Sequence, residues 1–168
     1  MSISNQISDI QPDWTREHKR LMSWNPSKSL LASIRAYQKY RRHPIFFIFR
    51  KIAVIRYHFW SFITGTDIAI NCQLGGGLLM PHPNGIVIHP KAIIGPNCLI
   101  FQQVTIGTVE GSGCPIIEGH VDIGAGAKIL GGIRIEAHAK IGANAVVLIN
   151  VPSGKVAVGV PAKIKELN

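Results

Sequence analysis

A branched aliphatic residue recurs at every sixth position through the C-terminal half of the chain. The pattern forms two runs, Ile88, Ile94, Ile100 and Ile106, then Ile117, Ile123, Ile129, Ile135, Ile141 and Val147. Neither a helix of 3.6 residues per turn nor a two-residue strand alternation produces a period of six. A short fixed period indicates a solenoid, and hexapeptides in particular indicate a parallel β-helix. We therefore expect a mainly β fold, with three hexads per coil and the aliphatic side chains stacked inside.

The six-residue register is interrupted twice. Two earlier units, 68–73 and 74–79, keep the spacing, but it slips before Ile88 and again before Ile117. Small or β-branched residues lie four positions after the aliphatics, where they suit a tight corner between the faces of a coil. The slips predict surface loops at 80–86 and 107–116. Insertions of this kind in a solenoid are commonly where function lies.

The N-terminal third has a different pattern. Apolar residues at spacings of three and four predict a helix over 27–40, with Pro26 near its start. Residues 44–63 predict a second, more apolar helix, which Arg50, Lys51 and Arg56 interrupt too often for a bilayer crossing. Two interpretations stay open for the 41–63 segment, namely packing within the protein and peripheral contact with anionic lipid. We therefore divide the chain into a helical segment, 1–66, and a β-helical domain, 67–168.

Charge is concentrated in the helical segment. Residues 1–66 contain eleven Lys and Arg against three Asp and Glu, whereas residues 67–168 contain seven against six. No nucleic-acid motif accompanies the basic segment, so we do not expect that partner. The three cysteines, Cys72, Cys98 and Cys114, show no CxxC spacing and no disulfide framework, which is typical of a reducing compartment. We expect a cytoplasmic protein without a signal peptide, although residues 1–25 look flexible or dependent on a partner.

Asp67 and His82 are the candidate catalytic pair. They lie fifteen residues apart, close to one coil of eighteen, so they could approach across adjacent coils. A histidine oriented by a carboxylate is a common general base, and it suits deprotonation of a hydroxyl. A surface histidine with no chemical role is the alternative. A metal centre built from His82, His89, His120 and His138, as in γ-class carbonic anhydrases, is a remote alternative, and we expect no metal.

The region from Asp67 to Ile164 resembles the serine O-acetyltransferase branch of the hexapeptide acyltransferases. The matching motifs are GLLMPHPNGIVI at 77–88, VTIG at 104–107, IGAGAKILG at 123–131, IGANAVV at 141–147 and VGVPAK at 158–163. The resemblance implies a left-handed parallel β-helix, homotrimers with active sites between subunits, and acetyl-CoA as the donor. It also implies His82 as the catalytic base and Asp67 as its partner.

The same resemblance implies a set of coenzyme contacts. The pantetheine arm would lie along the coils and bond to backbone groups, with a basic residue near the nucleotide end. The residues at the matching positions are Gly107, Thr108, Ala125 and Ala143 for the arm and Lys163 for the nucleotide.

The second loop departs from the serine-type pattern. An Arg-His pair before a proline helps to hold the amino-acid acceptor in that family, and here the place reads Gly113-Cys114-Pro115. A carboxylate acceptor favours a cation at short range. The Cys-Pro sequence and the short basic N-terminal segment resemble acetyltransferases of surface-polysaccharide synthesis, such as the colanic acid type. Cys114 itself is expected to be a loop thiol, because direct transfer needs no acyl-enzyme.

These observations predict an acetyl-CoA-dependent O-acetyltransferase with a saccharide hydroxyl as acceptor, in surface-polysaccharide biosynthesis. Asn84 and Cys114 are the expected acceptor-side loop residues. The alternative is a serine O-acetyltransferase that makes O-acetyl-L-serine for cysteine biosynthesis. A non-enzymatic β-helix scaffold is a remote alternative.

Overall fold

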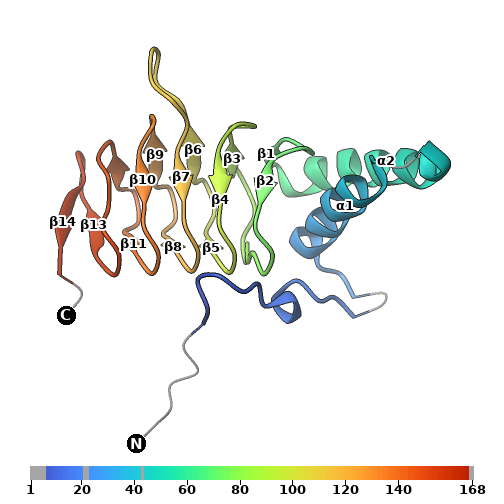
Figure 1. Ribbon diagram of the computed structural model, residues 1–168, viewed down its shortest axis with the longest axis horizontal. Helices are drawn as coiled ribbons and strands as arrows, with labels where there is room; N and C mark the ends of the chain where they lie inside the picture. The colour runs from blue at the N-terminus through green and yellow to red at the C-terminus, as the bar shows by residue number, and fades with distance from the viewer. Residues whose placement is uncertain (1–6, 21–22, 43, 167–168) are drawn as a thin grey trace, which may run out of the picture.

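The chain forms a β-helical rod with a pair of helices against one end (Figure 1). The computed structural model describes residues 7–20, 23–42 and 44–166. Helix α1 spans Pro26–Tyr40, and it begins where the Asn25 side chain accepts the backbone N–H of Lys28. Helix α2 spans Phe47–Thr64 and ends at Gly65, which has a φ of 60°. Both helices lie where the apolar spacing predicts them.

Three parallel sheets make up the rod. The first sheet contains β1 (Asp67–Ile68), β3 (Val87–Ile88), β6 (Thr105–Gly107), β9 (Lys128–Leu130) and β12 (Val146–Val147). The second contains β2 (Gln73–Leu74), β4 (Ile93–Ile94), β7 (Ile116–Ile117) and β10 (Arg134–Ile135). The third contains β5 (Leu99–Ile100), β8 (Asp122–Ile123), β11 (Lys140–Ile141), β13 (Val156–Val158) and an antiparallel last strand, β14 (Lys163–Lys165). Up to β13, successive strands belong to different sheets, which confirms the predicted parallel β-helix.

The repeated aliphatics stack in register inside the rod. In the first sheet Ile68 pairs with Ile88, Ile88 with Ile106, and Ile106 with Ile129. All of these side chains are at most 2% exposed. Full burial of one such side chain stabilises the fold by about 1.5–3 kcal/mol relative to leaving it in water. The hexad register is therefore the pattern of the hydrophobic core.

Both slips in the register are surface loops, as predicted. The first sheet has a leading edge, where its strands begin, and a trailing edge, where they end. The loop at 80–86 comes immediately before β3 at the leading edge, and the loop at 108–115 comes immediately after β6 at the trailing edge. Figure 1 shows the 108–115 loop standing out from the rod. The two loops therefore lie at opposite edges of one sheet.

The N-terminal segment 7–20 is held against the rod, which corrects the expectation of a flexible segment for these residues. The Asn97 side chain accepts the N–H of Asp13 at 2.8 Å, and the Arg16 guanidinium donates to the Asn97 carbonyl at 2.6 Å. Residues 1–6 and 21–22 lie outside the described residues. These contacts were not predicted because they are mostly polar contacts to backbone groups, which leave no apolar period in the sequence.

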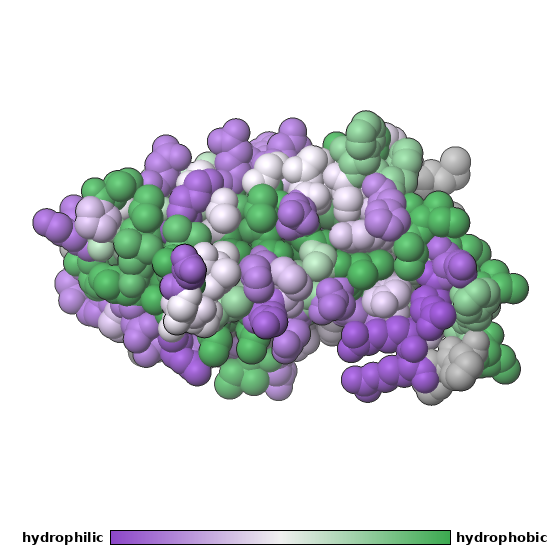
Figure 2. Space-filling view, turned by 90° about the horizontal axis from the view of Figure 1, so that it is seen from above, coloured by the Kyte–Doolittle hydropathy of each residue, from purple (hydrophilic) through white to green (hydrophobic). Residues whose placement is uncertain are grey.

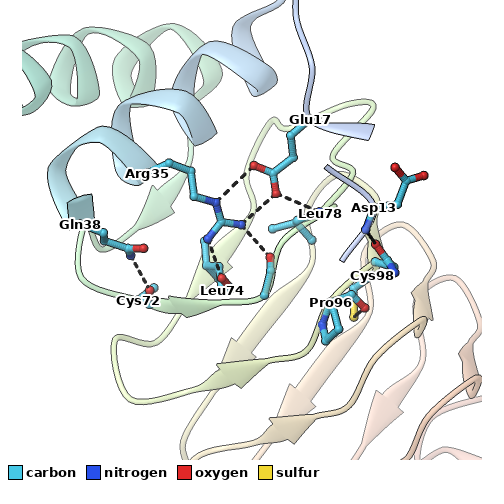
Figure 3. Close-up of polar contacts among 11 residues, drawn as sticks. Asp13, Glu17, Arg35, Gln38, Cys72, Leu74, Leu78, Pro96 and Cys98 are labelled. Carbon is cyan, nitrogen blue, oxygen red and sulfur yellow. Dashed lines mark hydrogen bonds and ion pairs between the residues drawn. The ribbon is translucent and has the colours of Figure 1, made fainter. Parts of the chain in front are cut away.

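Arg35 ties α1 and the N-terminal segment to the first coil (Figure 3). Its guanidinium pairs with Glu17 at 2.9 Å and donates to the carbonyls of Leu74 and Gly75. Glu17 in turn accepts the N–H of Leu78 at 3.1 Å. One guanidinium therefore bonds to both carboxylate and backbone acceptors, and this fixes the helical pair at the start of the rod.

Candidate functional site

Asp67 and His82 lie on neighbouring coils at the leading edge of the first sheet. Asp67 opens β1, and its N–H donates to the Ile86 carbonyl at 2.9 Å, so the 80–86 loop lies beside it. The N–H of Gly85 donates to Gly65 at 3.0 Å and holds the loop against the end of α2. Both candidate side chains are exposed, and no hydrogen bond or ion pair joins them in the described chain. The pair stays a prediction, because the structure shows the 80–86 loop bonded to the backbone of Asp67 but no contact between the two side chains.

Asp67 also influences a half-buried hydroxyl and a buried thiol. Burial raises the pKa of the Tyr57 hydroxyl, and the charge of Asp67 raises it further; this hydroxyl donates to the Ile68 carbonyl at 2.9 Å. Burial raises the pKa of the Cys72 thiol to about 11, again with a smaller contribution from Asp67. Cys98 is fully buried, and its pKa is also about 11 because of burial. Both thiols therefore stay protonated in the core, and neither is suited to nucleophilic chemistry.

The residues expected to contact the coenzyme divide between the two edges. Ala125 and Ala143 stack at the leading edge, where the Asn144 N–H donates to the Ala125 carbonyl at 2.8 Å. A side chain at Gly124 would come within 2.6 Å of the Ala143 nitrogen, so the coils approach closely here. Lys163 is exposed at the start of β14, at the C-terminal end of the rod. Within one chain the leading edge thus carries His82, Asn84 of the same loop, and two of the expected coenzyme contacts.

Gly107, Thr108 and Cys114 lie at the trailing edge, away from His82. Gly107 ends β6 and Thr108 begins the 108–115 loop. The Thr108 hydroxyl lies 3.1 Å from three carbonyl oxygens of its own loop, so it braces the loop internally. A side chain added at Gly132 would lie 3.0 Å from the Gly113 nitrogen, which shows how closely the loop approaches the next coil.

A cavity of about 370 Å³ lies under this loop. Its walls come from two neighbouring coils and consist of His89, Lys91, Ile93, Thr108, Ser112, Gly113, Cys114 and Ile116. The Cys114 thiol contacts the His89 imidazole, with Sγ 3.1 Å from Nδ1. His89 was considered from the sequence only as a remote metal ligand, and Lys91 was not named. The available signal was their spacing, because His89 precedes Gly107 by one coil of eighteen residues.

His120 and His138, named above only for the remote metal alternative, are in direct contact, which was not predicted from the sequence. They occupy the same corner on successive coils, and their Nδ1 atoms are 2.7 Å apart. Asp9 lies 3.9 Å from the Nε2 of His138. Within the described ranges no group of three or more His, Cys, Asp or Glu side chains is arranged to hold a metal ion. The pair lies at the corner between the second and third sheets, away from both loops.

Known proteins resemble this chain in sequence and in fold. No protein-family model matches the sequence. A serine acetyltransferase of Synechococcus elongatus is 41% identical over 110 residues, which cover 64% of this chain and 45% of that protein. A soybean serine acetyltransferase in complex with serine matches with a TM-score of 0.67 and 34% identity, over 83% of this chain and 56% of the other. A Brucella abortus serine acetyltransferase in complex with coenzyme A matches with a TM-score of 0.71 and 34% identity, over 84% of this chain and 56% of the other.

These relatives correct the prediction of a saccharide acceptor. They carry the name serine acetyltransferase, which was the alternative, and the colanic acid character finds no support among them. The saccharide prediction rested on the Cys-Pro sequence of the second loop and on the short basic N-terminal segment. It did not consider His89 and Lys91, which the preceding coil brings to the same cavity. The chain spans about half the length of the relatives it matches. Over that length, the chain is similar in sequence and in fold to serine acetyltransferases.

Proposed function

We propose that the protein transfers the acetyl group of acetyl-CoA to the hydroxyl of L-serine. The main support for this proposal is the similarity to serine acetyltransferases. The candidate catalytic residues Asp67 and His82 also lie on neighbouring coils of this chain. Relatives solved with serine and with coenzyme A give the two substrates a precedent on this fold.

The proposed reaction is a direct transfer. His82 removes the proton of the serine hydroxyl, and Asp67 positions the imidazole. The resulting oxygen nucleophile attacks the thioester carbonyl, and backbone N–H groups near Gly107 stabilise the oxyanion. When the tetrahedral intermediate collapses, the carbon–sulfur bond breaks and coenzyme A leaves with the proton that His82 returns. The products are the O-acetyl ester and the free thiol of coenzyme A.

We also propose that the active site is shared between subunits of a homotrimer. The leading edge carries His82 and the stacked alanines, whereas the trailing edge carries Gly107 and the cavity beside Cys114. Two edges of one sheet cannot face each other in one chain, but the leading edge of one subunit can face the trailing edge of its neighbour. A monomer in solution with full turnover would contradict this arrangement.

Peripheral contact with an anionic lipid surface is a separate proposal for α2. Ile48, Ile52, Ile55, Phe59 and Phe62 recur at helical spacing, and each is at least 47% exposed. Residues 18–66 contain ten Lys and Arg and no Asp or Glu. Such a surface would repel a second copy of itself and attract anionic lipid.

None of the described helices is long and apolar enough to cross a membrane. With three free cysteines and acetyl-CoA as donor, we place this contact on the cytoplasmic side.

Replacing the proposed base tests the chemistry. We expect His82→Ala to reduce thiol release from acetyl-CoA in the presence of L-serine by roughly 10²–10⁴-fold. Coenzyme A binding, measured by calorimetry, should be retained. His120→Asn is the matched control, because it removes a histidine far from both loops and should leave the rate unchanged. Full activity in His82→Ala would refute the proposed mechanism.

A further inference from the structure

The cavity under the 108–115 loop is lined by cationic and hydrogen-bonding groups. Lys91 provides an ammonium and His89 an imidazole, and among the described residues no Asp or Glu lines the cavity. The hydroxyls of Thr108 and Ser112 also line it, but they bond to carbonyls of their own loop. A pocket with donors and a cation but no carboxylate favours an anionic ligand over a cationic one. At about 370 Å³ it has room for a small molecule.

Lys91 has an ammonium group available for a ligand. Its side chain is exposed, and it forms no hydrogen bond or ion pair with another residue in the described part of the chain. Other lysines are engaged: Lys128 donates to the Gln103 carbonyl at 2.7 Å, and Lys140 pairs with Asp122 at 3.9 Å. Lys91 is therefore the cation that this cavity offers to an incoming carboxylate.

The hydrogen bonds of His89 make the imidazole a donor as well. Its Nδ1 accepts the backbone N–H of Lys91 at 3.2 Å, and the Cys114 thiol approaches the same atom at 3.1 Å. An Nδ1 that accepts carries no proton, so the proton of the neutral ring is on Nε2. Neighbouring backbone and thiol thus fix the tautomer, and Nε2–H is left as the second donor of the cavity.

We infer that Lys91 binds the carboxylate of the amino-acid acceptor, with the Nε2–H of His89 as the second donor of the subsite. This inference rests on the proposed function, and it adds Lys91 as the residue that selects an acceptor with a carboxylate. Gly113 leaves the 108–115 loop without a cation of its own, and Lys91 supplies one from the corresponding corner of the preceding coil. The serine hydroxyl then points toward His82 of the adjacent subunit in the proposed trimer.

Cys114 allows the inference to be tested without turnover. It is partly exposed and lines the cavity, whereas Cys72 and Cys98 are buried with a raised pKa, so iodoacetamide should modify Cys114 selectively. Peptide mass spectrometry then measures how fast Cys114 is alkylated with L-serine, with L-serinamide, which lacks the carboxylate, or with neither. We expect L-serine to slow alkylation and L-serinamide to have no effect.

Variants at position 91 test whether Lys91 binds the carboxylate. Lys91→Met should abolish protection by L-serine, Lys91→Arg should keep part of it, and the matched control Lys140→Met should keep all of it. In steady state, Lys91→Met should lower kcat/KM for L-serine roughly 10- to 100-fold while leaving the KM for acetyl-CoA and the rate with L-serinamide unchanged.

Two outcomes would overturn the assignment. Equal protection by L-serine and L-serinamide would show that the cavity does not bind the carboxylate. Protection that survives in Lys91→Met would show that Lys91 is not part of the subsite. The proposed function fails separately, if the wild-type protein releases no thiol with L-serine while Cys114 is still protected.

Discussion

At the residue scale, the corners of the rod require backbone that most side chains avoid. Among the described residues, those other than glycine with positive φ are Asn97, Gln103, His120, His138 and Asn144. Asparagine tolerates the left-handed region better than most residues because its short polar side chain bonds locally. The Asn97 side chain uses this position to anchor the N-terminal segment. At the next two coils of the same corner, histidine replaces asparagine.

The His120–His138 pair should make stability depend on pH. Burial lowers the pKa of His120, with His138, Arg16 and Lys140 acting in the same direction and Asp122 opposing them. As pH falls, the unfolded chain binds the proton first. The contribution to the free energy of unfolding is therefore complete above about pH 6.5 and is lost as pH falls below it.

We expect His120→Asn to flatten this dependence while keeping a residue that tolerates positive φ. Thermal unfolding at about pH 7.5 and about pH 5.5 should show a smaller difference in Tm for the variant than for the wild-type protein. Equal differences in Tm would contradict a role for His120 in acid destabilisation.

At the element scale, the helices and strands follow from local pattern, whereas the contacts between them do not. The period of 3.6 placed α1 and α2, and the hexads placed the strands, because each period records which side chains meet the core. The 7–20 segment was missed since it binds through backbone and polar atoms. His89 and Lys91 were not predicted to line the cavity because a hexad register does not reveal that the 108–115 loop folds back over the preceding coil.

The proposed lipid contact of helix α2 can be tested with vesicles. Figure 2 shows hydrophobic surface gathered at the helical end of the molecule, beside strongly hydrophilic side chains. We expect the full chain to sediment with vesicles that contain anionic lipid and to be released by salt, because the attraction is screened. Replacing Ile55 and Phe62 together by Glu should reduce binding sharply, since both are well exposed on α2.

The matched control for this experiment is Leu148→Glu, at an exposed apolar residue in the rod. This variant should bind vesicles as the wild-type protein does. Binding that ignores both salt and anionic lipid would contradict an electrostatic contact.

At the scale of the whole molecule, a rod of short strands places the candidate chemistry at two edges of one sheet. The two interruptions of the hexad register predicted the loops that contain the candidate residues. The structure confirms these loops at 80–86 and 108–115. Sequence alone led to the wrong acceptor, because it showed that Gly113 lacks a charge but not that Lys91 reaches the same cavity. The assignment of a substrate on this fold therefore depends on contacts between coils as much as on any single loop.

The most direct test is to identify the product formed from acetyl-CoA and L-serine by the purified full chain. We predict stoichiometric formation of free coenzyme A and O-acetyl-L-serine, detected by mass spectrometry, and loss of both in His82→Ala. Thiol release without an acetylated serine, or acetylated serine at the same rate in His82→Ala, would contradict the account.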